Sequence, residues 1–409
     1  MIRWIILIGI YVLIDLYAFQ VFRSLVKNNW IYWGGGILSL MVLVNLIYRF
    51  YTHDDTPESD TLRGYAIGIF LAVFIPKLLV VAFMFFEDIA RIFVGLYYKI
   101  SNPSESFFIP SRRKFVGILT LSAATIPFAS LLYGMSRGKY NYQVLQYALE
   151  FDDLPEDFDG FQITHISDIH CGSFDNKEKV NYGIDLINQQ HSDVILFTGD
   201  LVNDKSDEIA RWKDDFAKLR AKDGVFSILG NHDYGDYVNW PSSLDKKNNL
   251  VRLKQIQAEM GWKLLCNESV FIEKEGSRIA LVGVENWGEG FKKEGDLDKA
   301  VQGVPTDIFK IVMSHDPSHW KSKIRDDKRQ FALTLSGHTH GMQFGIEIPG
   351  WVKWSPVKYK YEHWAGIYEE NGKYINVNRG FGFIGYPGRV GIWPEISVIT
   401  LRKKKNSLI

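Results

Sequence analysis

Four apolar stretches in the first 139 residues constrain the fold of this chain more than any other feature. They lie at about residues 2–22, 30–48, 65–86 and 115–135. Each approaches the ~20 residues that a helix needs to cross the ~30 Å hydrocarbon core of a bilayer. They follow one another before any strand-like pattern begins, and Trp4, Trp30 and Tyr48 lie near their ends, as is typical of membrane interfaces. We therefore expect an α-helical membrane region of about four spans over residues 1–139.

Two ionisable residues lie inside these apolar stretches. Asp15 is in the first stretch, and Lys77 follows Pro76 in the third. A charge within lipid must face the other helices or reach toward the interface. Asp15 and Lys77 therefore either pair with each other or mark a path through the membrane, and pairing is the commoner explanation.

Basic residues in the short loops predict the orientation, because Lys and Arg accumulate on the cytoplasmic side. Arg23 and Lys27 follow the first stretch, the loop at 49–64 is acidic on balance, and the basic cluster Arg112-Arg113-Lys114 precedes the fourth stretch. This cluster also resembles a twin-arginine export signal, and a stop-transfer cluster is the alternative. Both interpretations place the C-terminal domain outside. We expect an integral protein of a bacterial inner membrane with an extracytoplasmic C-terminal domain.

The charge balance of the whole chain limits the partners that it binds. Its 409 residues include 47 Lys and Arg and 47 Asp and Glu. This balance argues against nucleic-acid binding through bulk positive charge, and we expect no nucleic-acid partner. The sequence does not identify a protein partner. Two cysteines, Cys171 and Cys266, are too few for a disulfide framework, although one bridge between them stays open.

Residues 140–409 show a different pattern, in which short β-rich apolar runs alternate with amphipathic segments such as 177–190 and 206–219. That alternation predicts an α/β domain. Five of the apolar runs end next to side chains that bind metals. These runs are 161–167, 193–198, 225–229, 308–314 and 331–336.

Seven side chains after these runs are candidate metal ligands: Asp168, His170, Asp200, Asn231, His315, His338 and His340. Ligands of an open α/β sheet bind beyond the carboxyl ends of its strands, so we expect these side chains to converge. Two carboxylates, one amide oxygen and four imidazoles suit manganese, iron or zinc better than calcium. With one carboxylate shared, the seven side chains form two adjacent sites of four ligands each. We therefore expect two divalent metal ions, a geometry that suits displacement at phosphorus.

The order of these residues resembles the motif set of the calcineurin-like metallophosphoesterases. The motifs are Asp168-x-His170, Gly199-Asp200, Gly230-Asn231-His232-Asp233, His315 and Gly337-His338-Thr339-His340. The resemblance covers about residues 140–402. Further features, such as Ser314-His315-Asp316-Pro317 and the run from Arg389 to Glu395, resemble bacterial membrane-associated phosphodiesterases of the YkuE/YaeI type. The resemblance implies a four-layer α/β/β/α sandwich, and it does not extend to the four spans.

The resemblance also implies a role for each residue of the site. Asp168, His170, Asp200 and His340 would hold the first ion. Asp200, Asn231, His315 and His338 would hold the second, so that Asp200 bridges the two ions. His232 would be the general acid or would stabilise the transition state, and Asp233 would orient His232. The ions would lower the pKa of bound water toward ~7, which gives a hydroxide that attacks phosphorus directly.

These features predict a membrane-anchored, dinuclear metal-dependent phosphoesterase that hydrolyses a phosphodiester or a pyrophosphate, with a lipid-linked phosphate ester as the favoured substrate. One alternative is a UDP-2,3-diacylglucosamine-type pyrophosphatase of lipid A synthesis, although that group usually has Arg where His232 stands. An alternative of another class is a non-catalytic metal-binding membrane scaffold, which the intact ligand set disfavours. The aromatic residues between Tyr234 and Trp262 either line an apolar substrate groove or pack within the domain.

Overall fold

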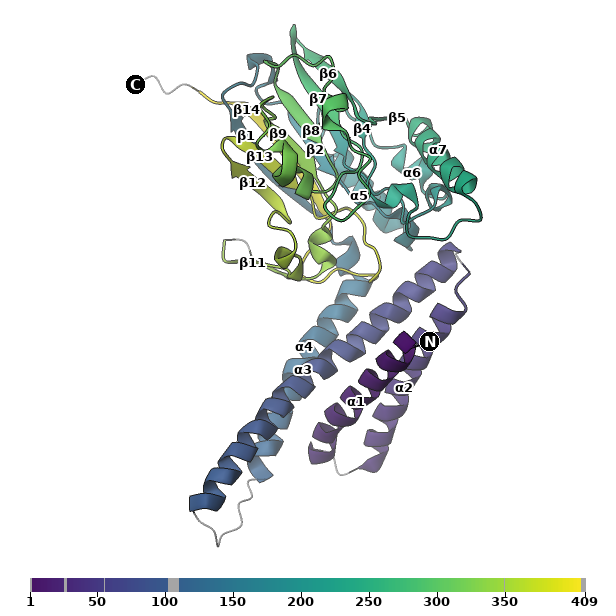
Figure 1. The fold of residues 1–409 in the computed structure, drawn as a ribbon, viewed down its shortest axis with the longest axis vertical. Helices are drawn as coiled ribbons and strands as arrows, with labels where there is room; N and C mark the ends of the chain where they lie inside the picture. Colours follow the sequence, from purple (N-terminus) through teal and green to yellow (C-terminus); the bar gives the residue numbers. More distant parts are fainter. Residues whose placement is uncertain (1, 26–27, 55, 102–109, 349, 406–409) are drawn as a thin grey trace. The chain divides into compact units, whose positions relative to one another are not determined.

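The structure is a computed structural model that describes residues 2–25, 28–54, 56–101, 110–348 and 350–405. The chain divides into two compact units, Met1–Ser136 and Arg137–Ile409. The first unit is helical and the second contains the sheets (Figure 1). Of the residues that bear on the orientation, Lys27 lies outside the described residues, and the side chain of Arg112 is not described either.

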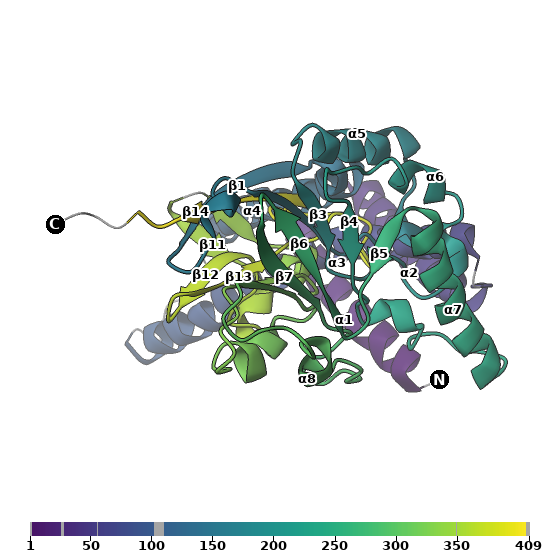
Figure 2. The same cartoon turned by 90° about the horizontal axis from the view of Figure 1, so that it is seen from above.

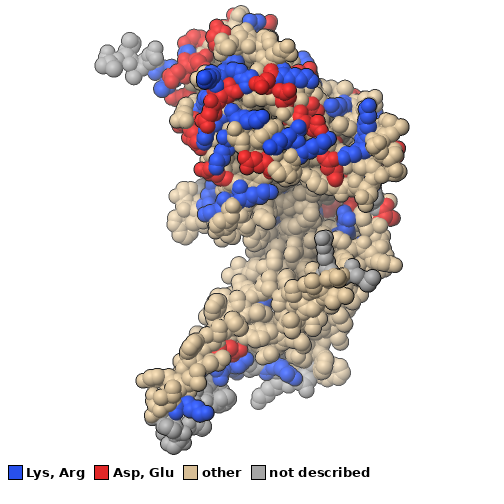
Figure 3. Space-filling view, viewed as in Figure 1, with Lys and Arg blue, Asp and Glu red and all other residues tan. Residues whose placement is uncertain are grey.

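Four long helices form the N-terminal unit. They are α1 (Ile2–Leu25), α2 (Asn29–Tyr51), α3 (Pro57–Ser101) and α4 (Pro110–Ser136). All four are long and apolar enough to cross a membrane. Many of their large apolar side chains are exposed, and the face of this unit in Figure 3 carries few charged residues. Exposed apolar surface of this kind suits contact with lipid, and the prediction of four long apolar helices in this region is confirmed.

Helix α3 is longer than the apolar stretch at 65–86 that predicted it. Its 45 residues correspond to about 67 Å at 1.5 Å per residue, which exceeds the ~30 Å hydrocarbon thickness. One charge in the added turns, Asp88, has partners on two other helices. Asp88 accepts a hydrogen bond from the Tyr17 hydroxyl at 2.7 Å and lies 3.4 Å from Arg113 of α4. These contacts link the extension of α3 to α1 and α4.

Asp15 and Lys77 form an ion pair between α1 and α3, as expected. Ser39 of α2 joins them, because Lys77 Nζ donates to Ser39 Oγ at 2.5 Å and Ser39 Oγ donates to Asp15 Oδ2 at 2.6 Å. The Tyr11 hydroxyl lies 2.7 Å from Ser39 Oγ. Both charges are thus satisfied within the bundle, and one polar partner from each of three helices fixes how those helices pack.

Removing one partner of this ion pair should destabilise the membrane unit, because the remaining charge stays buried without compensation. We expect Lys77→Met or Asp15→Leu alone to cost about 3 kcal/mol. The double variant should be more stable than either single variant, since it leaves no unpaired charge. Thermal unfolding of the full chain in detergent, followed by tryptophan fluorescence, measures this order. A double variant less stable than both single variants would show that the two residues are not coupled.

Two six-stranded sheets form the core of the C-terminal unit. Their strand orders are β1-β14-β2-β3-β4-β5 and β12-β13-β9-β8-β7-β6, and β10 and β11 form a separate hairpin. The strands are β1 (Gln143–Phe151), β2 (Gln162–Ile166), β3 (Val194–Phe197), β4 (Val225–Ser227), β5 (Trp262–Leu264), β6 (Glu268–Lys274), β7 (Ser277–Gly283), β8 (Lys310–Met313), β9 (Leu333–Ser336), β10 (Ile346–Ile348), β11 (Val352–Trp354), β12 (Gly366–Glu370), β13 (Lys373–Val377) and β14 (Glu395–Lys403). The five runs that precede candidate ligands form β2, β3, β4, β8 and β9, which confirms them as strands.

Alternating side chains place the two sheets face to face between helices. In β3, Val194 and Leu196 point into the core shared with the second sheet, whereas Ile195 and Phe197 point to the helices outside. Those outer elements are α5 (Lys177–Asn188), α6 (Lys213–Phe216) and α7 (Ser243–Glu259) on the first sheet, and α8 (Leu297–Ala300) with a π-helical turn (Trp320–Ile324) on the second. Figure 2 shows α5 and α8 on opposite sides of the sheets. The predicted α/β/β/α sandwich is confirmed.

The amphipathic segment 206–219 predicts a regular helix, and this prediction is wrong. That segment forms a 3-10 helix at Ser206–Ile209 and only the four-residue α6 after it. At the break, the backbone N–H groups of Ala210 and Trp212 donate to the carbonyls of Asp207 and Ile209, three residues back, at 3.1 and 2.9 Å, so the chain forms turns in place of a regular helix. Before this segment, the Glu208 carboxylate accepts the backbone N–H groups of residues 203–205 at 2.6–2.9 Å and fixes a turn there. Burial raises the pKa of Glu208 to about 7.

Candidate metal centre

The seven candidate ligands lie at the carboxyl ends of β2, β3 and β4 from one sheet and of β8 and β9 from the other. Six of them are buried, and His338 is half-buried. The Asp and His ligand atoms, together with those of His232, form three groups within which all atoms lie within 4.8 Å of one another. The first group is Asp168, His170 and His340, the second is Asp200, His315 and His338, and the third, which shares residues with both, is His170, Asp200 and His232. The structure therefore brings the predicted side chains into one place.

The first group surrounds His340. Its Nε2 atom lies 3.1 Å from Asp168 Oδ1 and 3.1 Å from His170 Nε2. Asp200 Oδ2 lies 3.6 Å from His170 Nε2. Two imidazole nitrogens and two carboxylates directed at one point leave lone pairs that a cation satisfies. This donor set fits one divalent ion held by nitrogen and oxygen.

The second group surrounds His315. Its Nδ1 atom donates to the Thr198 carbonyl at 2.7 Å, so the lone pair of neutral His315 is on Nε2. That Nε2 lies 3.1 Å from Asp200 Oδ2 and 3.1 Å from Asn231 Oδ1. His338 Nδ1 adds a further nitrogen at 2.8 Å from Asn231 Oδ1. These donors fit a second ion, and Asp200 also lies beside His170 of the first group.

Electrostatics at the site favour a positive charge between the carboxylates. Burial lowers the pKa of His315, but the neighbouring Asp200 outweighs burial and raises that pKa to about 10. Burial would raise the pKa of Asp168, but the facing His340 outweighs burial and holds that pKa well below its usual range. Burial lowers the pKa of His338 to about 4, which keeps its imidazole in the neutral form that binds metals.

Five of the ligands have left-handed backbone, which side chains rarely adopt. They are Asp168, His170, Asp200, His338 and His340, with φ from 47° to 68°. Such conformations cost of order 1 kcal/mol each and cluster at functional sites. The reversal of the chain after each strand turns the side chain toward the common centre. Position 337 requires a glycine, because a Cβ atom there would clash with the Asp168 carboxylate.

Asp233 and His232 have different partners in the structure. The Asp233 carboxylate accepts three backbone N–H groups at 2.8–2.9 Å, from Asp200, Leu201 and Gly230. It therefore ties the loop after β3 to the loop after β4. The His232 ring is held by the Asn203 carbonyl, 2.7 Å from Nδ1. Asn203, which the sequence did not single out, thus has the orienting contact that was expected of Asp233.

Tyr361 and Asp316 extend the site behind His338. An ion bound to His338 Nδ1 would leave the proton on Nε2, which lies 2.9 Å from the Tyr361 hydroxyl and would donate to it. The Tyr361 hydroxyl in turn donates to Asp316 Oδ2 at 3.5 Å. A chain of this kind fixes the tautomer and the orientation of a metal-binding histidine. Asp316 adjoins a motif, whereas no local sequence signal identifies Tyr361.

Arg389 supports the loop that carries Asp168 of the first group. Its buried guanidinium donates to the carbonyls of Arg379 and Gly382, both at 2.7 Å. The Gly382 N–H in turn donates to the Asp168 carbonyl at 2.9 Å. Arg389 therefore holds the segment that packs on the loop of Asp168. Burial lowers the pKa of Arg389 to about 9, and at neutral pH the side chain remains charged.

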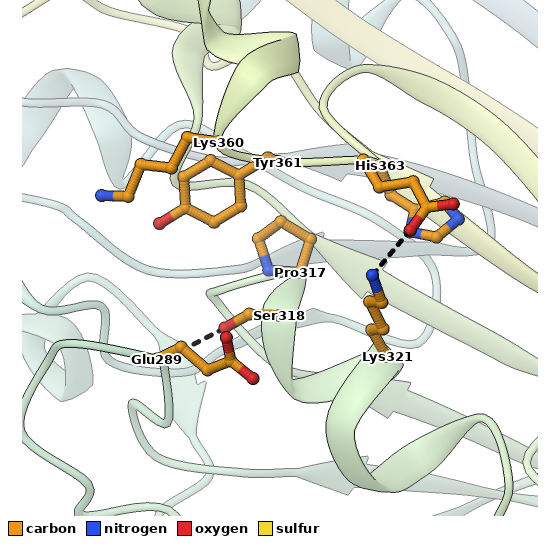
Figure 4. Close-up of a pocket in the computed structure, with 8 residues that line it drawn as sticks. Glu289, Pro317, Ser318, Lys321, Lys360, Tyr361 and His363 are labelled. Carbon is orange, nitrogen blue, oxygen red and sulfur yellow. Dashed lines mark hydrogen bonds and ion pairs between the residues drawn. The ribbon is translucent and has the colours of Figure 1, made fainter.

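A cleft of about 200 Å³ adjoins the second group. Its lining is Glu289, Pro317, Ser318, Lys321, Lys360, Tyr361, Glu362 and His363 (Figure 4). Lys321 is paired with Glu362 at 2.7 Å. The Lys360 ammonium lies over the rings of Phe291 and Tyr361, and the Phe291 ring contacts His338. The cleft thus places the Lys360 ammonium near His338, a candidate metal ligand.

Of the two alternatives for the aromatic residues between Tyr234 and Trp262, packing within the domain holds for these two residues. Trp262 is buried against Phe197 in the core, and Tyr234 is buried with its hydroxyl on Glu285. Tyr237, from the same segment, does reach the site. Its ring lies 4.5 Å from the His232 ring, and its hydroxyl accepts a hydrogen bond from Asn231 Nδ2 at 2.9 Å.

Comparison with known families agrees with this geometry. Residues 161–342 match the calcineurin-like phosphoesterase family, and residues 2–139 match a family described as the probable transmembrane domain of calcineurin-like phosphoesterases. The chain therefore carries a calcineurin-like metallophosphoesterase domain, a class of hydrolase, and is a membrane protein with a four-helix N-terminal domain.

Individual relatives carry the same domain. The uncharacterized metallophosphoesterase YkuE of Bacillus subtilis is 28% identical over 71% of this chain and 98% of its own length. The phosphodiesterase YaeI of Escherichia coli is 26% identical over 71% of this chain and 99% of its own length. A transmembrane protein with metallophosphoesterase domain of Danio rerio is 24% identical over 69% of this chain and 63% of its own length. The resemblance seen in the motifs is confirmed.

Tyr361→Phe should weaken metal binding by about 10-fold, because His338 loses the acceptor that fixes its tautomer. A chelator titration of the full chain, with bound metal measured by mass spectrometry, gives the affinity. Tyr359→Phe is the matched control, since Tyr359 is a neighbouring tyrosine that is 78% exposed. Equal metal affinity in the two variants would show that Tyr361 does not support metal binding by His338.

Proposed function

We propose that the chain is a membrane-anchored phosphoesterase that uses two divalent metal ions to hydrolyse a phosphodiester or a pyrophosphate. The observation that carries this proposal is the position of Asp200, whose Oδ2 atom lies 3.6 Å from His170 Nε2 on one side and 3.1 Å from His315 Nε2 on the other. Manganese, iron and zinc all suit the mixed nitrogen and oxygen donors. The proposed ligands are Asp168, His170, Asp200 and His340 for one ion and Asp200, Asn231, His315 and His338 for the other.

The residues around the ions have separate tasks in this mechanism. Two bound ions would supply an activated water and would neutralise charge on the phosphate. Asn203 holds His232 through Nδ1, which leaves Nε2 to protonate the leaving oxygen. Tyr361 and Arg389 keep the ligand loops in position. Lys360, in the adjoining cleft, attracts negative charge on the part of the substrate that is not transferred.

A lipid-linked phosphate ester is the substrate class that best suits this arrangement. The cleft beside His338 accommodates a small anionic group, and the four membrane helices keep the chain where lipids are abundant. A UDP-2,3-diacylglucosamine-type pyrophosphatase requires the same chemistry with the domain on the cytoplasmic side. A metal-binding scaffold has no need for His232 beside the ligands, and the strained ligand loops also argue against this alternative.

Two variants should separate metal binding from catalysis. Asp200→Ala removes the shared carboxylate and should abolish both metal occupancy and turnover. His232→Ala should keep the metal ions but slow turnover by roughly 10²- to 10⁴-fold, because only the proton donor is lost. Hydrolysis of bis-(p-nitrophenyl) phosphate and metal content, both measured on the full chain, are the readouts. The loss should be largest for substrates with poor leaving groups.

Two results would contradict this assignment. Loss of the metal ions in His232→Ala, or full turnover of a poor leaving group by that variant, would show that His232 does not donate the proton. Absence of hydrolysis by the unmodified chain with manganese, iron, zinc and nickel would favour the scaffold instead.

We place the catalytic domain outside the cell membrane. Arg23 follows the first span, and Arg113 and Lys114 begin the fourth span, so both positions are assigned to the cytoplasmic side. Four spans then put Met1 and the C-terminal domain on the same, outer side. An outer location favours a phospholipid, a lipid-linked phosphate or another extracytoplasmic phosphodiester over a UDP-linked lipid.

Fusions after Ile409 test this orientation directly. Alkaline phosphatase becomes active only when it is exported, whereas a fluorescent protein that folds only in the cytoplasm reports the opposite location. We expect a strong phosphatase signal and no fluorescence. Fluorescence without phosphatase activity would reverse the orientation and make the UDP-linked pyrophosphatase the first choice of function.

A further inference from the structure

An exposed apolar patch lies on the chain segment that follows the last metal ligand. Its members are Met342, Ile346, Ile348, Trp351 and Tyr359, with exposed fractions of 59%, 53%, 44%, 79% and 78%. The hairpin of β10 and β11 forms the middle of this segment (Figure 1). The other exposed large apolar residues described in the C-terminal unit are spread over other elements: Tyr182, Tyr237, Leu244, Val251 and Phe271. Such a concentration marks an interaction surface.

The hairpin is attached to the domain by its polar face. Ile346 pairs with Trp354 and Ile348 with Val352, and the pair Glu347 and Lys353 lies between them. Neighbouring side chains of a strand point to opposite faces, so the apolar residues share one face and the two charged residues share the other. Glu347 forms an ion pair with Arg379 at 2.6 Å, and Lys353 donates to the Ala365 carbonyl. The apolar face is consequently directed away from the domain.

The same segment is tied to the metal centre. Ser355, directly after β11, donates from Oγ to the Gly341 carbonyl at 2.8 Å, and Gly341 follows His340. Tyr361, at the other end of the segment, binds His338 through its hydroxyl. A small hydrophobic core also holds this part of the chain. It consists of Val357, Tyr361, Trp364, Ala365 and Ile392. The patch is therefore held in a set position relative to two proposed ligands.

The residues around the patch are those that favour a lipid interface. Lys358 and Lys360 are exposed on either side of Tyr359. Exposed Trp and Tyr with flanking Lys suit the headgroup layer, where rings are half immersed and ammonium groups meet lipid phosphates. The four membrane helices keep this domain attached to a bilayer, so a lipid surface is within reach of it.

We propose that the patch of Met342, Ile346, Ile348, Trp351 and Tyr359 inserts into the headgroup layer of an anionic lipid surface beside the metal centre. The patch then guides the polar head of a lipid toward the cleft of Lys360 and Tyr361. Membrane contact by the patch depends on no metal chemistry, whereas the delivery of a lipid to the cleft rests on the proposed phosphoesterase function.

Depth-dependent quenching tests the insertion. In a Cys266→Ala background, in which the remaining Cys171 is fully buried, Trp351→Cys is labelled in detergent with an environment-sensitive nitrobenzoxadiazole dye. The full chain is then reconstituted into vesicles of phosphatidylcholine and phosphatidylglycerol in equal parts, with or without brominated acyl chains. We expect a blue-shifted emission that brominated lipid quenches at least twofold. Tyr359→Cys is a second probe of the patch.

Tyr182→Cys is the matched control, because Tyr182 is a 55% exposed aromatic residue on α5 of the same unit. Its label should show neither the blue shift nor the quenching. Equal quenching at positions 182 and 351, or none at 351 and 359, would overturn the insertion. A blue shift at 351 that depends on protein density and not on brominated lipid would assign the patch to contact with a second copy and would also overturn it.

An activity measurement separates this proposal from the proposed function. Ile348→Ser with Trp351→Ser should reduce turnover of a phosphodiester presented in vesicles by about 10-fold, and hydrolysis of soluble bis-(p-nitrophenyl) phosphate should stay unchanged. An equal loss on both substrates would contradict a role in lipid delivery. A chain that is inactive on both substrates but still quenched at 351 would refute the phosphoesterase function and leave the insertion standing.

Discussion

The buried carboxylate of Asp200 is the group on which the arrangement of the C-terminal unit depends. Its Oδ2 atom faces His315 and His170, and its Oδ1 atom accepts the backbone N–H of His232 at 2.9 Å. A buried carboxylate without positive partners would lose its charge, because desolvation favours the neutral acid. The surrounding imidazoles of His315, His232 and His170 keep the ionised form stable at the junction of the two sheets.

Holding that carboxylate in place has a conformational cost, which the sandwich offsets. Five ligands with left-handed backbone together forgo several kcal/mol at roughly 1 kcal/mol each. Each of these residues follows a strand that is buried on both faces, so strand packing sets the direction from which its loop departs. Asp233 and Arg389 then fasten the loops to each other through backbone groups. Two packed sheets can thus bring five strand ends to one point.

The sequence predicted those parts of the site that have local signals. An apolar run followed by Asp, His or Asn marks both the strand and its ligand, so the five strand ends and the seven side chains were found together. Tyr361 and Asn203 reach the site only through tertiary folding, and no run or motif marks them. The regular helix expected at 206–219 also failed: its periodicity was correct, but hydrogen bonds to carbonyls three residues back divide the segment into short turns, and no local signal marks them.

The N-terminal unit and the hairpin both enclose polar groups and expose apolar ones, and both arrangements point to a bilayer. In the N-terminal unit, Asp15 and Lys77 are enclosed with Ser39 while apolar side chains face outward. In the hairpin, Glu347 and Lys353 are bound to the domain, and the apolar side chains again face outward. Burying one large apolar side chain is worth roughly 1.5–3 kcal/mol, which the outward-facing residues of a marginal two-stranded hairpin forgo in water. Lipid contact recovers that energy, so the same solvent that selects four apolar helices also stabilises the hairpin.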